Sequence, residues 1–77
     1  KHGINYNADG SVTFVFYDKD TAGQSHKYCY IVGEWNDWTR KTEGAMYFDG
    51  SQSCWWITLD GFDPDKEYRF QYRLGRQ

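Results

Sequence analysis

The chain lacks several features that assign a protein to a functional class. It has no run close to the roughly 18 apolar residues of a membrane-spanning helix. It has one proline and two cysteines among 77 residues, and its nine Lys and Arg are scattered and outnumbered by eleven Asp and Glu. Nucleic-acid binding through the phosphate backbone needs a concentrated basic surface. We therefore expect no membrane span and no nucleic-acid partner.

The two cysteines are Cys29 and Cys54. They form at most one bridge, which is too few for the disulfide framework of a small secreted domain. Their positions match neither a Cys-x-x-Cys pair nor a cysteine–histidine ligand set, so we expect no zinc site. The count leaves the compartment and the redox state of both thiols open.

Histidines and acids are present, but their positions do not predict a catalytic set. His2 lies at the chain start and His26 in a polar segment, so both are expected in solvent. Asp18 and Asp20 lack the fuller Asp-x-Asp-x-Asp-Gly pattern of a calcium loop and are interpreted as a solvated turn. We expect no catalytic residue, no metal and no cofactor in this chain.

What the chain has in quantity is aromatic residues, which make up 21% of it. A chain this short buries only about 60% of the surface that its unfolded form exposes, so large rings must supply much of the core. We expect a single domain over residues 1–77, without linker or internal repeat. Because the chain begins at Lys1 without a methionine, we expect it to be a piece of a larger protein.

Alternating apolar and polar residues predict short strands separated by turns. No segment repeats the helical i, i+3, i+4 pattern over a helical length. Short strands at this spacing are typical of an antiparallel β-sandwich, an all-β fold. The predicted strands are Val12–Tyr17, Tyr28–Val32, Ala45–Phe48, Cys54–Leu59 and Glu67–Leu74.

Two adjacent tryptophans in one predicted strand are expected on opposite faces, because side chains alternate along a strand. Trp55 alternates with apolar residues and is expected in the core. Trp56 then faces outward. If Cys54–Leu59 and Glu67–Leu74 pair as a hairpin, Trp56 shares a face with Arg69 and Gln71.

An indole beside a guanidinium and an amide suits a sugar. The ring stacks on the apolar C–H face of a pyranose, while the planar donors and acceptors reach its hydroxyls. The alternative interpretation of an outward Trp56 is a patch that another domain of the parent protein covers.

The segment Val32–Thr39 (VGEWNDWT) raises the same question for two more tryptophans. Trp35 follows a strand end and is expected to fold back over the core edge. Trp38 lies beyond the turn-forming Asn36-Asp37 and is expected outside, because Asn and Asp side chains bond the local backbone and direct the next residue.

The segment Tyr30–Trp38 resembles the V-x-G-x-F-N-x-W signature of carbohydrate-binding module family 48, with Trp35 in place of the usual Phe. Trp55–Phe62 and Tyr68–Phe70 also resemble that family's W-x-V-x-L-x-x-L and Y-K-F strands, in the same order. The resemblance covers residues 12–74. Members are immunoglobulin-like E-set domains of starch- and glycogen-active enzymes and of the AMP-activated protein kinase beta subunit. The sequence is also similar to the N-terminal domains of secreted or periplasmic α-amylase-family enzymes of Bacteroides-like bacteria.

The resemblance implies roles for two residues. Trp38 matches the tryptophan that stacks on glucose units, and Arg69 matches a lysine that bonds sugar hydroxyls; Arg keeps the donors with a broader fork. The family's second stacking tryptophan, in a D-G-x-W turn, has no aromatic counterpart in Arg73–Gln77. Trp56 is a substitute that the residues suggest and the family does not.

Two hypotheses follow. The first is a non-catalytic module that binds α-glucan, such as starch or glycogen, through Trp38, Trp56, Arg69 and Gln71. The second is a structural E-set domain that docks on the catalytic domain of the same polypeptide and buries Trp56 there. In both, the chain itself is not an enzyme, and glycoside hydrolysis belongs to an α-amylase-like neighbouring domain, because it needs two positioned carboxylates in a cleft.

Overall fold

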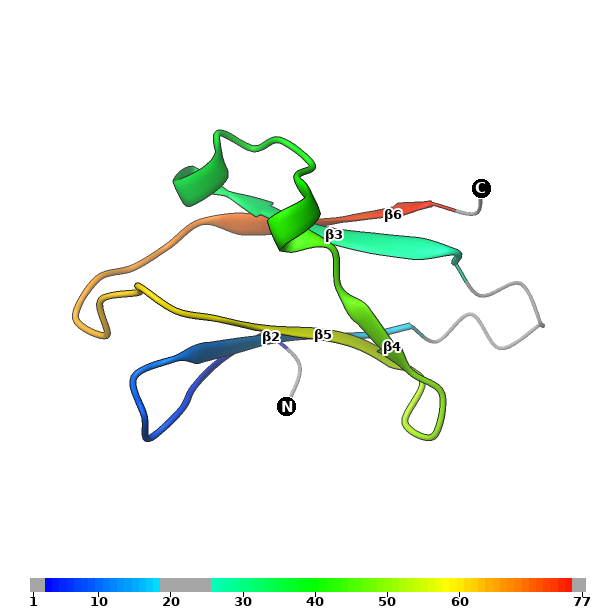
Figure 1. The fold of residues 1–77 in the computed structure, drawn as a ribbon, viewed down its shortest axis with the longest axis horizontal. Coiled ribbons are helices and arrows are strands. Elements are labelled where there is room, and N and C mark those ends of the chain that lie inside the picture. The colour runs from blue at the N-terminus through cyan, green and yellow to red at the C-terminus, as the bar shows by residue number, and fades with distance from the viewer. Residues whose placement is uncertain (1–2, 19–25, 76–77) are drawn as a thin grey trace.

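The computed structural model describes residues 3–18 and 26–75, which form two antiparallel sheets that face each other (Figure 1). No α-helix occurs in these residues, and none of their helical segments is long and apolar enough to cross a membrane. The prediction of an all-β sandwich is therefore confirmed. In chain order the elements are β1 (Gly3–Tyr6), β2 (Val12–Tyr17), β3 (Tyr28–Gly33), the 3-10 helices η1 (Glu34–Asn36) and η2 (Thr42–Gly44), β4 (Tyr47–Asp49), β5 (Cys54–Leu59) and β6 (Phe70–Gly75).

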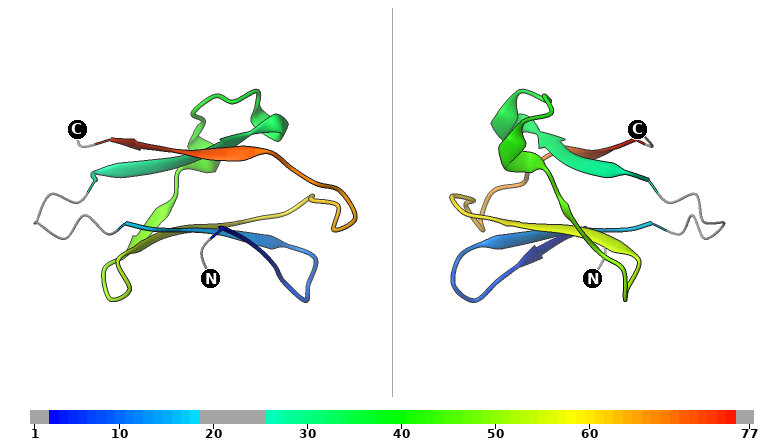
Figure 2. Two further views of the ribbon diagram at one scale, coloured as in Figure 1. Left: turned by 180° about the vertical axis from the view of Figure 1, so that it is seen from behind. Right: turned by 45° about the vertical axis from the view of Figure 1, so that its right-hand side comes forward.

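One sheet has four strands in the order β1-β2-β5-β4, and the other has two, β3 and β6. The last two strands do not form the hairpin on which a shared face of Trp56, Arg69 and Gln71 depends. β5 pairs with β2 and β4, whereas β6 pairs with β3. Residues 60–69 carry the chain from one sheet to the other, as both views of Figure 2 show. This crossing decides which of the predicted site residues share a surface.

Strand boundaries agree with the sequence pattern where alternation is strong. The predicted strands Val12–Tyr17 and Cys54–Leu59 coincide with β2 and β5. The strand predicted at Ala45–Phe48 begins two residues later, because Ala45 instead forms an isolated bridge with Tyr30 of the other sheet. That bridge ties the two layers together beside η2.

Other boundaries differ more. The strand predicted at Glu67–Leu74 starts only at Phe70, and β1 is not among the predicted strands. The predictions for His2 and Asp20 lie outside the described residues.

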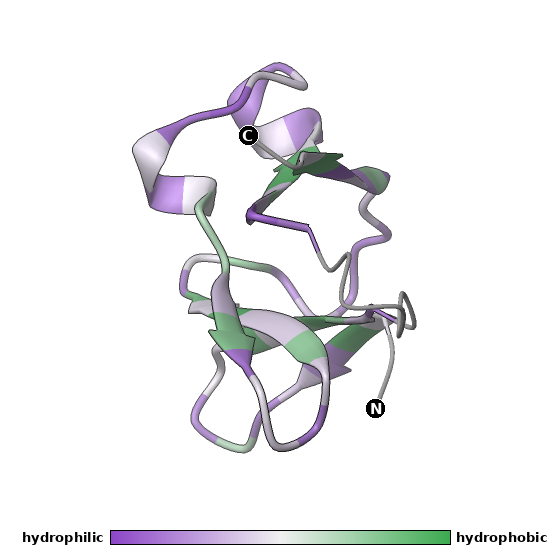
Figure 3. Ribbon diagram, turned by 90° about the vertical axis from the view of Figure 1, so that its right-hand side faces the viewer, coloured by the Kyte–Doolittle hydropathy of each residue, from purple (hydrophilic) through white to green (hydrophobic). Residues whose placement is uncertain are grey.

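The core is built where the two sheets meet. Cys29 and Ile31 face inward, which settles the alternation of β3, and Trp55 is 6% exposed, as predicted. Figure 3 shows the strongly hydrophobic residues on the strands. Burial of this apolar surface is the main term that stabilises the sandwich. The buried cluster comprises Val12, Phe14, Cys29, Ile31, Met46, Trp55 and Ile57.

Aromatic rings pack around Phe14, which is fully buried. Trp35 stacks on it with ring centroids 5.4 Å apart, and Phe62 and Phe70 approach it edge-on at 5.7 and 5.0 Å. Such geometry adds roughly 0.5–1.5 kcal/mol per pair beyond area burial. The prediction that Trp35 folds back over the core edge is confirmed.

Asp18 is buried, which corrects the prediction of a solvated turn. Its Oδ2 accepts a hydrogen bond from the Trp55 indole Nε1 at 3.2 Å and lies 2.8 Å from His26 Nδ1. The His26 side chain is only 23% exposed, so it is not the solvated histidine that the sequence predicts. The two contacts of Asp18 therefore connect the end of β2 to Trp55 in β5 and to His26 before β3.

Candidate functional site

A tight turn positions Trp38 after β3. The side-chain oxygen of Asn36 accepts the Gly33 N–H at 2.8 Å, and its amide nitrogen donates to the Ile31 carbonyl at 3.2 Å. The chain then reverses through two residues in left-handed conformation, Asp37 (φ 59°) and Trp38 (φ 57°). The Trp38 N–H closes the turn by donating to the Gly33 carbonyl at 3.0 Å. Backbone outliers of this kind persist only where surrounding contacts hold them.

Gly33 allows this turn to lie against the core. A Cβ at this position would come 2.4 Å from the Trp35 ring and 2.6 Å from the Arg69 carbonyl oxygen. Glycine therefore lets the Trp35 ring and the chain entering β6 approach the backbone together. Trp35 goes inward as a result, and Trp38, 40% exposed, remains outside as predicted.

Cross-strand register brings Arg69 and Gln71 to the same end of the two-stranded sheet. Gln71 pairs with Val32 in β3. The Glu34 N–H donates to the Arg69 carbonyl at 3.2 Å, and the Arg69 N–H donates to Glu34 Oε1 at 3.0 Å. Both Arg69 and Gln71 are exposed. These bonds fix the backbone of the sheet end from which Trp38 emerges.

The outward face of this sheet is partly covered. Ile31 faces the core, so its neighbour Val32 points to the outer side of the sheet. Val32 is nevertheless fully buried, because residues 34–44 cover this part of the outer face (Figure 1). Arg73 follows Gln71 on the uncovered part and donates a hydrogen bond to the Gln71 side-chain oxygen. This contact presents the Gln71 amide nitrogen as a donor. We use the name β3–β6 face for the exposed side chains on and beside these two strands, namely Trp38, Arg69, Gln71 and Arg73.

A further aromatic and cationic group on this sheet was not predicted from the sequence. The Arg40 guanidinium lies 5.7 and 6.0 Å from the ring centroids of Tyr28 and Tyr30 and donates to the Tyr28 hydroxyl at 3.0 Å. Cation–π contacts of this kind hold a guanidinium over the rings. The alternation of Tyr28 and Tyr30 is visible in the sequence. The sequence does not show that the chain folds back so that Arg40, ten residues after Tyr30, lies over these rings.

Trp56 is not part of the β3–β6 face. It points outward from β5, as predicted, and is 38% exposed, but it lies on the four-stranded sheet beside Tyr47, with ring centroids 5.3 Å apart. Gln71 lies on the other sheet, between Phe70 and Tyr72, which pack against the core, so it points away from Trp56. The predicted common face of Trp38, Trp56, Arg69 and Gln71 is therefore divided between opposite surfaces of the sandwich.

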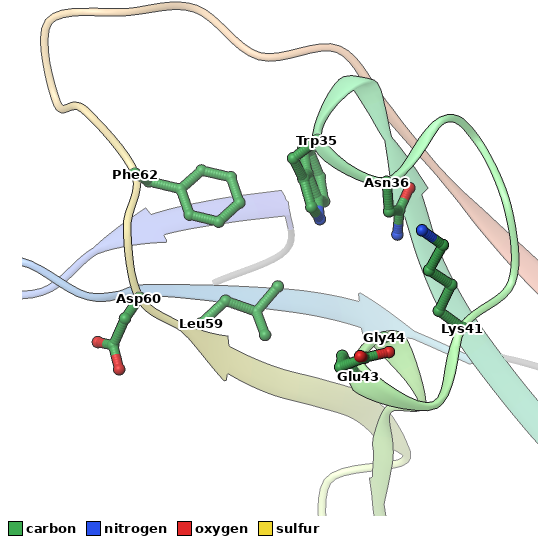
Figure 4. A pocket seen from close by; sticks show the side chains of 8 residues that line it. All are labelled: Trp35, Asn36, Lys41, Glu43, Gly44, Leu59, Asp60 and Phe62. Carbon is green, nitrogen blue, oxygen red and sulfur yellow. The ribbon is translucent and has the colours of Figure 1, made fainter.

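A pocket of about 270 Å³ opens between the sheets at one end of the molecule (Figure 4). The rings of Trp35 and Phe62 line its inner part, and Lys41 lies at its rim. The carboxylates of Glu43 and Asp60 point away from each other in this view. The lining thus combines two aromatic rings with one ammonium group and two carboxylates.

The thiols are buried and unreactive in character. Cys29 and Cys54 are both free, so no bridge joins them. Burial, followed by the nearby Asp18 charge, raises the pKa of Cys29 to about 12. Burial also raises the pKa of Cys54. Because the thiolate is the nucleophile and the metal ligand, neither sulfur is prepared for such chemistry at neutral pH.

The described residues contain no group of three or more His, Cys, Asp or Glu arranged to hold a metal ion. Comparison of the chain with protein-family models and with curated proteins finds no match. Functional inference therefore depends on the surfaces described above.

Proposed function

We propose that this chain is a non-catalytic α-glucan-binding module with an immunoglobulin-like E-set fold, and that its β3–β6 face contacts starch or glycogen. The strand orders β1-β2-β5-β4 and β3-β6 support the fold assignment, since they correspond to A-B-E-D and C-F of an immunoglobulin domain. The motif around Trp38, which resembles that of carbohydrate-binding module family 48, supports the ligand class.

The observation that carries the proposal is the position of Trp38. Its exposed indole follows a turn bonded to Gly33, at the sheet end that also presents Arg69 and Gln71. A pyranose has an apolar C–H face that an indole covers, and equatorial hydroxyls that a guanidinium and an amide bond in the plane of the ring. In this function Trp38 stacks, Arg69 donates, and Gln71 donates from the nitrogen that Arg73 leaves available.

Chemistry on the glycan belongs to another domain in this proposal. The parent polypeptide carries an α-amylase-like catalytic domain, and this module holds the chain of the polysaccharide near it. Tethering of this kind raises the effective concentration of substrate at the catalytic cleft.

Titration of the nitrogen-15-labelled chain with maltoheptaose tests the proposal. We expect the Trp38 indole N–H and the Gln71 amide signals to shift, and Trp38→Ala to lower the affinity at least about tenfold, or roughly 1.4 kcal/mol. Phe48→Leu is the matched control, because Phe48 is an aromatic of β4 on the other sheet that is 44% exposed, and leucine keeps an apolar contact with Trp55. Unchanged Trp38 and Gln71 signals at about 10 mM ligand, ten times a Kd of 1 mM, would reject glucan binding at this face.

A second candidate is the structural E-set domain that docks on the catalytic domain, and one observation favours it. β6 has β3 as its one neighbour in the sheet order of the described residues, and the immunoglobulin topology places a seventh strand there. A hollow of about 500 Å³ lies beside this edge, lined by Ile4 and Tyr6 of β1 and by residues 67–69. A segment of a neighbouring domain that adds to β6 would fill this hollow.

Hydrogen exchange distinguishes the second candidate. Docking along β6 predicts slower exchange of the Phe70 and Leu74 amides in the full-length parent protein than in this chain alone. Equal exchange in both proteins counts against docking at this edge, whatever the result of the sugar titration.

A further inference from the structure

A second aromatic surface lies on the outer face of the four-stranded sheet. Cross-strand pairing places Val15, Trp56 and Tyr47 in one row across β2, β5 and β4. Val15 is buried, whereas Trp56 is 38% and Tyr47 is 61% exposed. The two exposed rings are tilted by 42° and lie 5.3 Å apart. Because β4 is the edge strand of this sheet, the exposed ring pair lies toward one edge of its outer face. Core packing does not explain the exposure of these two rings.

Polar groups border this row on both sides. On one side the hydroxyls of Thr13 and Thr58 lie 2.8 Å apart, and the Asn7 amide donates to Thr13 Oγ1 at 2.9 Å. On the other side the register continues through Cys54 to Asp49. The exposed rings therefore have threonine hydroxyls along one margin and, along the other, the buried Cys54 followed by Asp49.

The surface is hollowed beside Trp56. A depression of about 260 Å³ is lined by this tryptophan and by Val15, Tyr17, Asp49 and Gln52, among others. It combines one aromatic wall with a phenol hydroxyl, a carboxylate and a primary amide. A shallow depression with an aromatic wall and a few polar groups is typical of a small-ligand site.

Asp49 is held in a fixed orientation at the margin. Its Oδ1 accepts hydrogen bonds from the Ser51 hydroxyl at 2.7 Å and from the Ser51 N–H at 3.0 Å. These bonds, the hydroxyl one foremost, lower the pKa of the Asp49 carboxyl, so it is ionised at neutral pH. An ionised carboxylate is a strong acceptor for sugar hydroxyls.

We propose that this surface is a second glycan-binding site, in which a pyranose ring stacks on Trp56 and Tyr47 while Asp49 and Gln52 bond its hydroxyls. The inference takes its ligand class, an α-glucan, from the proposed function and otherwise stands on different residues. An exposed aromatic pair with hydroxyls on one side and a carboxylate and an amide on the other offers a stacking face and hydrogen-bonding groups to one sugar ring. A docked protein domain covers a broader area, of the order of 800 Å² of surface per partner.

The Trp38→Ala variant isolates the second site, because it removes the stacking ring of the β3–β6 face. We expect maltoheptaose to shift the Trp56 indole N–H of this variant in a saturable manner. Adding Trp56→Ala to it should lower the residual affinity at least about tenfold. Gln52→Ala changes a residue in an exposed turn, where folding is not at risk. Made in the native chain, it should weaken binding at Trp56. The response of the Trp38 signal to maltoheptaose should stay the same as in the native chain.

The two sites fail separately in this experiment. A Trp56 signal that stays still at about 10 mM maltoheptaose, ten times a Kd of 1 mM, overturns the second site whether or not Trp38 responds. A Trp56 shift together with an unresponsive Trp38 in the native chain upholds the second site and rejects the proposed function of the β3–β6 face. A Trp56 shift that Gln52→Ala does not weaken overturns the assigned hydrogen-bonding margin.

Discussion

Asn36 fixes the backbone turn that leads from β3 to Trp38. Its side chain is 8% exposed and bonds the backbone on both sides of the β3 end, at Gly33 and Ile31. A buried amide that satisfies two backbone groups cannot be replaced without leaving them unpaired. In the sequence, Asn36 lies between Trp35 and Trp38. Its two hydrogen bonds fix the backbone turn that leads to the exposed Trp38.

Replacing Asn36 by Ala should therefore destabilise the fold and the site together. We expect the free energy of unfolding to fall by about 1–3 kcal/mol, since two backbone partners lose a buried hydrogen bond. Urea unfolding at constant pH measures this loss. Thr39→Ala is the control, because the Thr39 hydroxyl donates to the Asp37 carbonyl on the exposed side of the same segment. A surface change of this kind should stay within about 0.5 kcal/mol. Equal losses in both variants would contradict the role of Asn36.

At the scale of elements, β6 is the strand whose placement matters most. Its Tyr72 hydroxyl donates to the Val15 carbonyl at 3.0 Å, which bonds the two-stranded sheet directly to β2. The Tyr72 ring also packs against Phe16 with centroids 5.0 Å apart. Burial, followed by the charge of Cys29, raises the pKa of Tyr72 to about 12 from 10.0. The hydroxyl is therefore protonated and donating in the folded protein well above neutral pH.

This shift predicts how stability depends on alkaline pH. The folded chain holds the Tyr72 proton more tightly than the unfolded chain, so its contribution is complete below about pH 10 and is lost as pH rises toward 12. Tyr72→Phe should cost about 0.5–1.5 kcal/mol at pH 7, the net value of one hydrogen bond. The native and variant curves should then converge above pH 10. Denaturant unfolding of both proteins from pH 7 to 11.5, in steps of about 0.5 pH unit, measures the two curves. A difference in free energy of unfolding that stays constant over this range would contradict the assignment.

The sequence predicts strands well where alternation is local and fails where pairing is not. Val12–Tyr17 and Cys54–Leu59 carry β-branched and aromatic residues in strict order, and both strands form as predicted. The hairpin of the last two strands is wrong because ten residues, 60–69, separate them, longer than a usual hairpin loop. This length lets the chain cross to the other sheet and pair with β3.

The candidate site was predicted in part for the same reason. The outward direction of Trp38 and Trp56 follows from local turn chemistry and from strand alternation, and both are exposed. Their separation onto opposite faces follows from β3 and β5 belonging to different sheets, and the separation of Trp56 from Gln71 follows from β6 pairing with β3. Neither pairing is encoded in the local pattern. The burial of Asp18 likewise depends on Trp55, 37 positions away.

At the scale of the whole molecule, the two aromatic surfaces lie on opposite outer faces of a thin sandwich. The chain measures 39 × 25 × 17 Å along its principal axes. If both proposed sites bind glucan, we expect a single polysaccharide chain to contact one side or the other. Two sites on one rigid body favour binding to a dense, multichain ligand, because the second contact becomes intramolecular.

Retention on insoluble starch should reveal this bivalency. We expect Trp38→Ala and Trp56→Ala each to reduce retention by a larger factor than each reduces affinity for soluble maltoheptaose, because either change also removes avidity, which contributes about 10²-fold or more. Affinity electrophoresis in gels with and without starch provides the comparison. Equal factors for the soluble and the insoluble ligand would contradict simultaneous engagement of both faces.

The most direct test of glucan capture at the β3–β6 face is a crystal structure of the chain grown with maltoheptaose. We predict a glucose ring stacked on the Trp38 indole, with the Arg69 guanidinium and the Gln71 amide nitrogen within hydrogen-bonding distance of its hydroxyls. A structure in which Trp38 is accessible in the lattice and maltoheptaose is bound elsewhere, or not at all, would contradict it.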